Sequence, residues 1–387
     1  METSEENYRK EAVRRFLAGE GAGDIALNLG RSRAWVHKWV KRYEKGEEEW
    51  HRELSRAPHT VPRKTPSETE GAVLEARRRL EGERYLQIGA SAIQEELRRA
   101  GLDDIPEIWT VNRILARHGL TKKKLPYQPK GKPYPSFPRS RPNQLQAGDL
   151  VGPRYLRGDG KFLSLNVMDI FRHKVGLGPV RSKEDGVLCG ALLGIWSRLG
   201  VPEYYQMDNE LSFHGSNRWP RSFGEMLRMC LALGVEPVFI PVGEPWRNGE
   251  IEKFQDTFDR KFFRAQSFAG FEQLQQEALV FEEAHNRRHR YTCLKGRTPI
   301  QVEEGCTFQP RLPPGGFLIP EKTPRRGKVH LVRFIRSNRV LDIFTEKFHV
   351  PKSLVYEYVV ATIRIRDQKL QVVHEGKLVC EFDYELL

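Results

Sequence analysis

The hydrophobic pattern changes its period along the chain. Residues 7–45 and 65–119 repeat apolar positions at helical spacing, with a polar, proline-bearing stretch between them. From residue 149 short apolar strands alternate with longer helical segments, and from 328 to 387 the pattern is strand-like throughout. These changes predict a multidomain chain that contains two α-helical modules, an α/β core and an all-β tail.

The first helical group has the layout of a helix-turn-helix. A short helical segment ends at Gly30, and Ser32 then precedes the helical run AWVHKWVKRYEKG as an N-cap. A short helix, a glycine turn and a capped helix rich in basic and aromatic residues are typical of this motif. We expect the start of the last helix to enter the major groove of DNA through Ser32, Arg33, His37 and Lys38. A three-helix packing module without DNA is the alternative.

The second helical group predicts another module of similar size. Residues 65–68 (TPSE) read as a capping box with proline at the first helical position, and Gly119 ends the last segment. We expect a second helix-turn-helix or winged-helix-like domain, so that two modules read an extended DNA site. The polar side of its last helix leaves these residues for DNA: Thr110, Asn112, Arg113 and Arg117.

Residues 120–148 contain several prolines and basic residues but no acidic residue. Such a stiffened connector cannot form a core, but it can follow a phosphate backbone. Its predicted DNA contacts are Lys122, Lys123 and Lys124. A solvated linker is the other interpretation, and both can hold together.

The α/β stretch from 149 to 305 predicts a ribonuclease H-like core with a mixed sheet. Three successive strands are followed by a helix that ends near Leu199, and then by alternating strands and helices. In a ribonuclease H-like fold this order places the first strand centrally, beside the strand that ends at Asp208.

Carboxylates mark the places where strands and a helix of this core begin or end. Asp149 begins the first strand, Asp208 follows a short apolar strand, and Glu250 and Glu252 open a helix after Asn248. Converging carboxylates repel one another and lose solvation, so they normally need bound cations. The pattern therefore predicts a magnesium site for phosphoryl transfer on nucleic acid.

The segments QAGDLVGP, MDNELSF and NGEIE, in that order, resemble the DDE integrase core of bacterial insertion-sequence transposases and retroviral integrases. NVMDIFRHKV resembles the second-strand segment of this family, and AHNRRHRYTCLKGRTP resembles the stretch that closes such domains. The resemblance covers roughly residues 143–305, and two N-terminal DNA-binding modules are typical of these transposases. The family's usual aromatic residue before the first Asp is absent, and the segment from Asp208 to Glu252 is longer than usual.

The resemblance implies a DDE-type polynucleotidyl transferase whose catalytic and metal-binding residues are Asp149, Asp208 and Glu252. It also implies two Mg²⁺ ions, with Mn²⁺ as a substitute. Helical periodicity does not choose between Glu250 and Glu252, which flank the apolar stripe of their helix on opposite sides. The NGxxE pattern of the family favours Glu252.

Other polar residues near the predicted site have simpler interpretations. Asp159 and Asp169 are expected to be structural, and Asn248 is expected to serve as a turn and capping residue. Basic residues of the following helix are predicted to lie along DNA, with a solvated face as the alternative: Lys253, Arg260 and Lys261.

The tail, residues 328–387, follows a proline-rich and basic linker over 306–327. Five or more short strands in so few residues predict a small β-barrel. Integrase-like proteins often end in such a barrel, which would bind DNA non-specifically or hold subunits together. A purely structural cap is the alternative.

Charge and cysteine usage agree with a nucleic-acid partner inside a cell. Lys and Arg total 64 against 51 Asp and Glu, a net charge of +13 that favours a polyanion. The five cysteines are scattered without a CxxC pair, which favours a reducing compartment and argues against zinc. No signal peptide or membrane span is evident, so we expect a cytoplasmic, nucleoid-associated bacterial protein without membrane partners.

Together these patterns predict a transposase that binds terminal inverted repeats, cuts 3′ ends with a metal and transfers them into target DNA. Its expected partners are double-stranded DNA (transposon ends and target) and itself, as a DNA-assembled dimer or higher oligomer. An inactive transposase-derived DNA-binding or repressor protein is the main alternative; an RNA-cutting nuclease would have no use for two duplex-reading modules. The expected boundaries are 1–46 and 65–119 for the two modules, 47–64, 120–148 and 306–327 for linkers, 149–305 for the core and 328–387 for the barrel.

Overall fold

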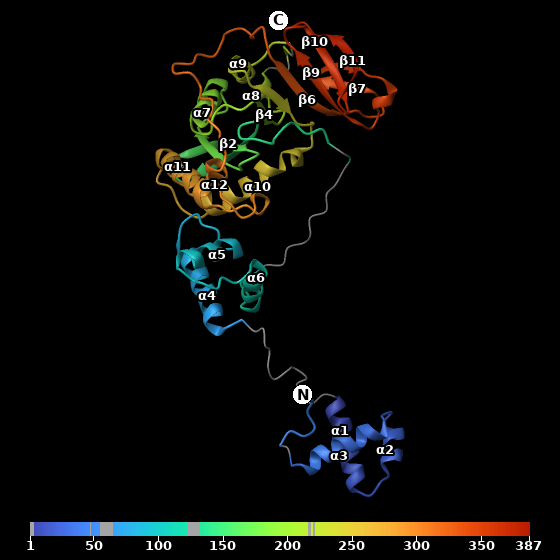
Figure 1. Ribbon diagram of the computed structural model, residues 1–387. Helices are drawn as coiled ribbons and strands as arrows, with labels where there is room; N and C mark the ends of the chain where they lie inside the picture. Colours follow the sequence, from blue (N-terminus) through green and yellow to red (C-terminus); the bar gives the residue numbers. More distant parts are fainter. Residues whose placement is uncertain are drawn as a thin grey trace. The chain divides into compact units, whose positions relative to one another are not determined.

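The computed structural model describes residues 4–46, 48–54, 65–121, 132, 134–215, 218–219 and 221–387. The chain divides into two compact units, Met1–Pro66 and Ser67–Leu387 (Figure 1). Each unit has its own hydrophobic core.

Three helices form the first unit: α1 (Ser4–Leu17), α2 (Ala22–Asn28) and α3 (Arg33–Glu44). Ala12, Ile25 and Val36 are fully buried where the helices meet. Trp39 joins this core, and the Arg9 guanidinium lies 4.2 Å from the centre of its ring. The predicted order of a short helix, a glycine turn and a capped helix is confirmed.

Ser32 caps α3, as the sequence predicts, because its side-chain oxygen accepts a hydrogen bond from the Trp35 backbone N–H at 3.2 Å. Ser32→Ala removes this side-chain acceptor and leaves the N–H only the Ser32 backbone carbonyl, at 3.0 Å, so we expect the first unit to lose about 1 kcal/mol of unfolding free energy. Chemical denaturation of the full-length protein measures the loss. Ser32→Asp supplies another acceptor and should retain most of the stability. A Ser32→Ala midpoint equal to that of the wild type would contradict the capping role.

The second unit begins with the predicted second group of helices, α4 (Ser67–Gly82), α5 (Ala90–Arg99) and α6 (Ile108–Arg117). Val73, Ile93 and Val111 are fully buried between them. The turn after α4 packs on the rest of the unit through Tyr85, whose ring lies 5.2 Å from that of Phe281. The three-helix module is therefore attached to the α/β part by side-chain packing.

A nine-stranded sheet in the order β11-β10-β9-β6-β5-β4-β1-β2-β3 forms the centre of the second unit. The predicted meander of three antiparallel strands is confirmed in β1, β2 and β3, and β4 and β5 follow in parallel beside β1. The strands are β1 (Leu145–Leu156), β2 (Gly160–Asp169), β3 (Val175–Val180), β4 (Tyr204–Met207), β5 (Glu236–Phe239), β6 (Lys328–Phe334), β9 (Tyr358–Arg364), β10 (Lys369–His374) and β11 (Lys377–Asp383).

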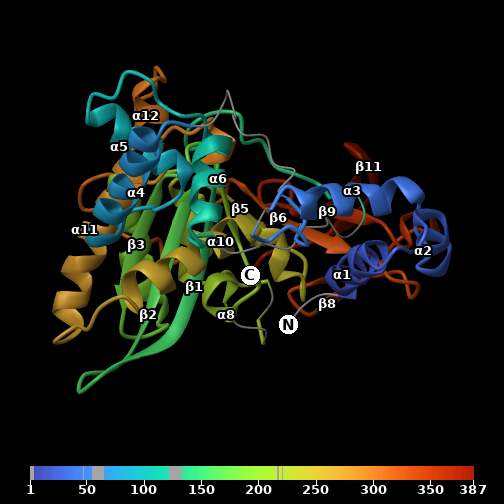
Figure 2. The same cartoon turned by 90° about the horizontal axis from the view of Figure 1, so that it is seen from below.

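Helices cover both faces of this sheet (Figure 1, Figure 2). They are α7 (Asp185–Leu199), α8 (Leu211–His214), α9 (Glu225–Ala232), α10 (Gly249–Phe258), α11 (Phe271–Arg288) and α12 (Pro299–Glu304), with short helical turns at Pro245–Asn248, Asp259–Phe263, Thr292–Leu294 and Lys352–Leu354. Across the described part of the chain, none of the helices combines the length and the apolar character that crossing a membrane requires.

The two faces have separate cores because successive side chains of a strand point in opposite directions. On β2, Leu163 and Leu165 lie in the cluster shared with α7 and α9. Phe162 and Met168 lie in the cluster shared with α10 and α11. This alternation decides which side of the sheet each functional side chain occupies.

The small β-barrel predicted over 328–387 is not confirmed. Strands β6, β9, β10 and β11 continue the sheet of the core, since β6 pairs with β5 in parallel (Val238 opposite His330). Only β7 (Val340–Ile343) and β8 (Glu346–His349) form a separate hairpin within the described residues. Without β6, the main chain of β5 would be left as an unpaired edge, and pairing removes that cost. Alternation in the sequence predicts strands but not the strand with which each one pairs.

Candidate active site

Asp149 and Asp208 lie at neighbouring positions of adjacent strands. Ala147 of β1 pairs with Gln206 of β4 in parallel register, and each aspartate lies two residues beyond its pair member. Residues two apart on a strand share a face, and Ala147 belongs to the cluster beneath α10. Both aspartates therefore occupy the face that α10 covers.

Helix α10 brings the third carboxylate to this face. Ile251, Phe254 and Phe258 are buried in the cluster shared with β1 and β2, which fixes the rotation of the helix. Glu250 is bound elsewhere: Arg139 donates a hydrogen bond to it at 2.6 Å, and His173 lies 3.8 Å away. Glu252 has no such salt bridge in the part of the chain that the structure describes, and its charge interacts with that of Asp149.

The electrostatics of these carboxylates reflect burial and mutual repulsion. The pKa of Asp208 is raised to about 6, chiefly by burial and also by the charges of Asp149 and Glu210, whereas a hydrogen bond from the Glu210 backbone N–H lowers it. Burial also raises the pKa of Asp149, and burial and the Asp149 charge raise the pKa of Glu252. In each of these carboxylates the charged form is therefore destabilised, and a bound cation would stabilise it.

The donor chemistry fits a divalent cation. Hard ions such as Mg²⁺ take carboxylate oxygens, and no described basic side chain forms an ion pair with Asp149, Asp208 or Glu252. Among the described residues, however, no three His, Cys, Asp or Glu side chains lie close enough to hold an ion together. The residues fit the ion by type and by their placement on neighbouring elements, but they do not form a closed group of three ligands.

Sequence reasoning missed several residues around the aspartates. Gln255 donates a hydrogen bond from Nε2 to Asp149 Oδ2, and the Leu150 backbone N–H donates to Asp149 Oδ1 at 2.8 Å. The signal for Gln255 was available, because it lies three residues after Glu252 and residues three apart share a helix face.

Gly148 leaves room for the Tyr205 side chain of β4 just before Asp149. A Cβ atom at this position would collide with the buried hydroxyl of Tyr205. Any larger residue at 148 would therefore have to displace the Tyr205 ring, which packs in the core on the other face of the sheet.

The carboxylates expected to be structural have partners of their own. Asp169 is fully buried and accepts hydrogen bonds from the backbone N–H groups of Asn143 and Arg172 at 2.5 and 2.7 Å. Asp159 is bound by the Arg181 guanidinium at 2.7 Å and by the Phe271 backbone N–H at 2.6 Å. These bonds account for both residues without a metal.

The predicted DNA contacts of the first unit line the exposed side of α3. Ser32, Arg33, His37 and Lys38 are all exposed, whereas Val36 and Trp39 face the core. The contacts of these four residues with DNA stay a prediction.

The corresponding set on α6 needs one correction. Asn112 and Arg113 are exposed, but Thr110 is only 9% exposed and lies on the buried side of the helix, which removes it from the predicted DNA surface. Arg117 is exposed and binds Glu70 at 2.8 Å. Lys122, Lys123 and Lys124 lie outside the described residues.

Among the basic residues after Glu252, Lys253 and Arg260 are exposed, and Arg260 pairs with Asp256 at 2.5 Å. Lys261 is different, because its ammonium donates a hydrogen bond to the Leu86 carbonyl at 2.5 Å. Burial lowers the pKa of Lys261 to about 8. The prediction that Lys261 contacts DNA is therefore corrected, because its ammonium binds the turn after α4 instead.

The lowered pKa of Lys261 predicts a pH-dependent stability. Because the folded protein favours the neutral amine, its unfolding free energy should rise from about pH 7 to about pH 10, and the gain is lost again as the pH falls through the folded pKa. Lys261→Met lacks the titrating group, so the stability difference between wild type and variant should grow in favour of the wild type over this range. Denaturation midpoints of both proteins across the range test this. A difference that stays constant with pH would contradict it.

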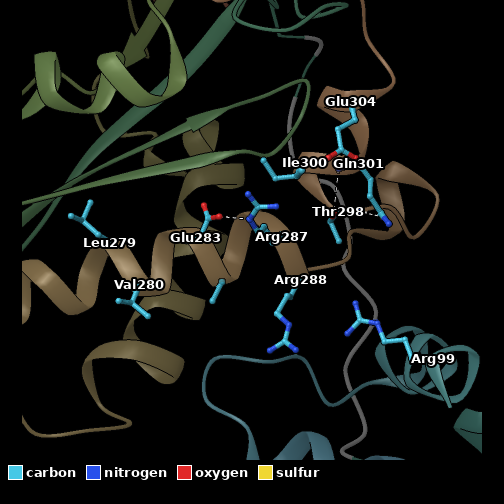
Figure 3. Close-up of a pocket in the computed structure, with 11 residues that line it drawn as sticks. Arg99, Leu279, Val280, Glu283, Arg287, Arg288, Thr298, Ile300, Gln301 and Glu304 are labelled. Carbon is cyan, nitrogen blue, oxygen red and sulfur yellow. Dashed lines mark hydrogen bonds and ion pairs between the residues drawn. The ribbon is translucent and has the colours of Figure 1, made fainter.

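A hollow of 850 Å³ lies on another part of the unit, between α11 and α12, with Arg99 of α5 at its rim (Figure 3). Leu279, Val280 and Ile300 provide its apolar surface, and Arg287 pairs with Glu283 beside it (Figure 3). Asp149, Asp208, Glu250 and Glu252 do not line it, so the candidate active site lies elsewhere.

Comparison with protein families confirms the resemblance read from the sequence. A model described as an integrase core domain matches residues 233–299, and one described as a homeodomain-like domain matches residues 5–50. The first match contains Glu252 and α10 and does not extend to Asp149 or Asp208. The chain thus carries an integrase-like segment and an N-terminal helix-turn-helix, as expected of transposases and integrases.

Several solved structures are similar to parts of the chain. The HTLV-2 integrase catalytic core domain in complex with magnesium shares 16% identity, covers 42% of this chain and 96% of its own, and has a TM-score of 0.33. A simian T-cell lymphotropic virus intasome in complex with the PP2A regulatory subunit B56 gamma shares 17% identity over 76% and 93%, with a TM-score of 0.38. The BIV integrase catalytic core shares 14% identity over 43% and 99%, with a TM-score of 0.32. No curated protein matches this chain.

Proposed function

We propose that this protein is a DNA transposase that binds terminal inverted repeats, cuts the 3′ ends with a divalent metal and joins them to target DNA. One observation carries the proposal. Asp149 on β1 and Asp208, which directly follows β4, occupy neighbouring positions on the face that α10 covers. Glu252 of α10 lies in the segment that the integrase core model matches.

In this proposal Asp149, Asp208 and Glu252 hold two Mg²⁺ ions, for which Mn²⁺ can substitute. Such ions, when bound, lower the pKa of an attacking water or 3′-hydroxyl and stabilise the leaving 3′-oxygen. The protein contributes position and charge rather than a covalent nucleophile. Gln255 and the Leu150 backbone N–H orient the Asp149 carboxylate, and the Glu210 backbone N–H orients that of Asp208 at 3.2 Å.

The other parts of the chain would bind the DNA on which this chemistry acts. The net charge of +13 suits a polyanionic partner, and Arg33, His37 and Lys38 are exposed along α3, as are Asn112 and Arg113 on α6. Two ends must be held together before they are joined, so a DNA-assembled dimer or higher oligomer is part of the proposal. A protein that acts on such DNA would be found at the bacterial nucleoid, in the cytoplasm.

Labelled duplexes that carry the DNA flanking the coding region test the proposal directly. Incubated with the full-length protein, they should be cut at a fixed position with Mg²⁺ or Mn²⁺ and stay intact with a chelator. Binding without cutting under any metal condition would instead favour the inactive DNA-binding or repressor protein. Cutting confined to RNA–DNA hybrids would favour a ribonuclease.

A further inference from the structure

Asn248 lies where the three elements of the candidate site meet. It ends the helical turn Pro245–Asn248 immediately before α10, and only 4% of it is exposed. Its Nδ2 donates a hydrogen bond to the Gly148 carbonyl at 3.1 Å, and its Oδ1 accepts one from Gln206 Nε2 at 3.1 Å. Asn248 lies in a turn and at the N-cap of α10, as expected, but its side chain makes no capping bond to the helix.

The two partners of Asn248 lie next to the two aspartates. The Gly148 carbonyl belongs to the peptide that leads into Asp149, and Gln206 precedes Asp208 by two residues on the same face of β4. Asn248 itself comes four residues before Glu252, about one turn of helix away. The side-chain amide of Asn248 thus connects β1 and β4 with the start of α10. These three elements position the three carboxylates.

The chemistry of the bridge requires an asparagine. One end must donate to a backbone carbonyl and the other must accept from an amide, and a carboxamide of this length supplies both. Aspartate would lack the donor and would add a fourth negative charge, whereas alanine would leave both partners without their bonds. A turn residue that served only the backbone would need neither group.

We propose that Asn248 is a positioning residue, which sets the separation of Asp149, Asp208 and α10 and thereby the affinity of the site for divalent metal. The inference rests on the proposed function and deepens it. Residues that support metal ligands from outside typically change metal affinity about 10- to 100-fold when they are lost.

The chain offers a matched control in Asn286. It is 3% exposed on α11, and its side chain accepts a hydrogen bond from the Val175 N–H and donates one to the Val175 carbonyl, both at 2.9 Å. It therefore equals Asn248 in burial and in the number of hydrogen bonds, but its partner is on β3, which carries none of the three carboxylates. Replacing it removes the same kind of bridge from another place.

The experiment measures binding of Mn²⁺ alone to the full-length protein by calorimetry, together with melting temperature. Asn248→Ala should weaken Mn²⁺ binding about 10- to 100-fold, whereas Asn286→Ala should bind as the wild type does, although both melt earlier. Wild-type affinity in Asn248→Ala would overturn the inference. An equal loss in both variants would also overturn it, because it would show a general effect of weakened packing.

Gln206→Ala keeps the inference testable if Asn248→Ala does not fold, since Gln206 is half-buried and only one of the two bonds is lost. Its Mn²⁺ affinity should fall in the same direction by a smaller factor, and an unchanged value would overturn the inference. A failure of the proposed function would give a different result from a failure of this inference alone. If the wild type binds no Mn²⁺, or if Asp208→Asn binds it equally well, the metal site is refuted and the inference with it.

Discussion

Asp208→Asn is expected to abolish metal-dependent DNA cleavage and to leave DNA binding unchanged. The substitution keeps the shape of the side chain but removes the charge that would hold the cation beside Asp149. Metal ions supply several kcal/mol of transition-state stabilisation, and each 1.36 kcal/mol is tenfold in rate, so the loss should be on the order of 10³-fold or more. Cleavage rates with Mg²⁺ and gel-shift affinities for the same flanking duplex measure the two quantities.

Asp159→Asn is the matched control for this experiment. Asp159 is a carboxylate in the turn between β1 and β2, bound by Arg181 and the Phe271 N–H, and it has no contact with the candidate site. It should cut DNA at nearly the wild-type rate. Undiminished cleavage by Asp208→Asn would refute the catalytic assignment.

Glu252→Gln is expected to reduce cleavage on the order of 10²-fold or more, whereas Glu250→Gln should stay within a few-fold of the wild type. The charge of Glu252 interacts with that of Asp149, and Glu252 has no ion-pair partner among the described residues, so its loss should remove one ligand of the proposed metal site. Glu250 is bound by Arg139, and its loss breaks a half-exposed salt bridge that contributes little. Cleavage assays with both variants at saturating Mg²⁺ decide between the two residues.

The pair of variants is its own control, because both change the same residue type on the same turn of α10. Equal folding of the two, checked by melting temperature, makes their rates comparable. The reverse result, with Glu250→Gln inactive and Glu252→Gln active, would show that the third ligand had been misassigned.

The meeting of Asp149 and Asp208 could be predicted from the sequence because three strands, a helix and a further strand follow the order of a ribonuclease H-like fold, which places β4 beside β1. The expectation that Asp149 begins the first strand was wrong, since β1 starts at Leu145 and Asp149 lies inside it. The choice between Glu250 and Glu252 could not be made this way. It depends on Arg139 and His173, which are distant in the sequence and reach Glu250 only in the folded chain.

Other features escaped prediction because they depend on partners that sequence patterns do not show. Thr110 is polar yet faces the core of its helical module, and Lys261 is basic yet donates to a carbonyl of the turn after α4. Asn248 stands in a turn-like sequence, but its side chain serves two strands. In each case the residue type suggests a surface or turn role, and the surroundings of the side chain in the folded chain give it a different one.

The continuation of the core sheet by β6 has a practical consequence for shortened forms of the protein. A fragment that stops before residue 328 would not simply lose an appendage. It would leave the main chain of β5 unpaired at the edge of the sheet and expose the apolar cluster to which Val329 and Leu331 belong. We therefore expect such a fragment to aggregate and precipitate. Expression trials of the second unit should therefore keep the chain through Leu387, because Tyr384 is fully buried in the same cluster and the Leu387 backbone N–H donates to the Arg221 carbonyl at 3.0 Å.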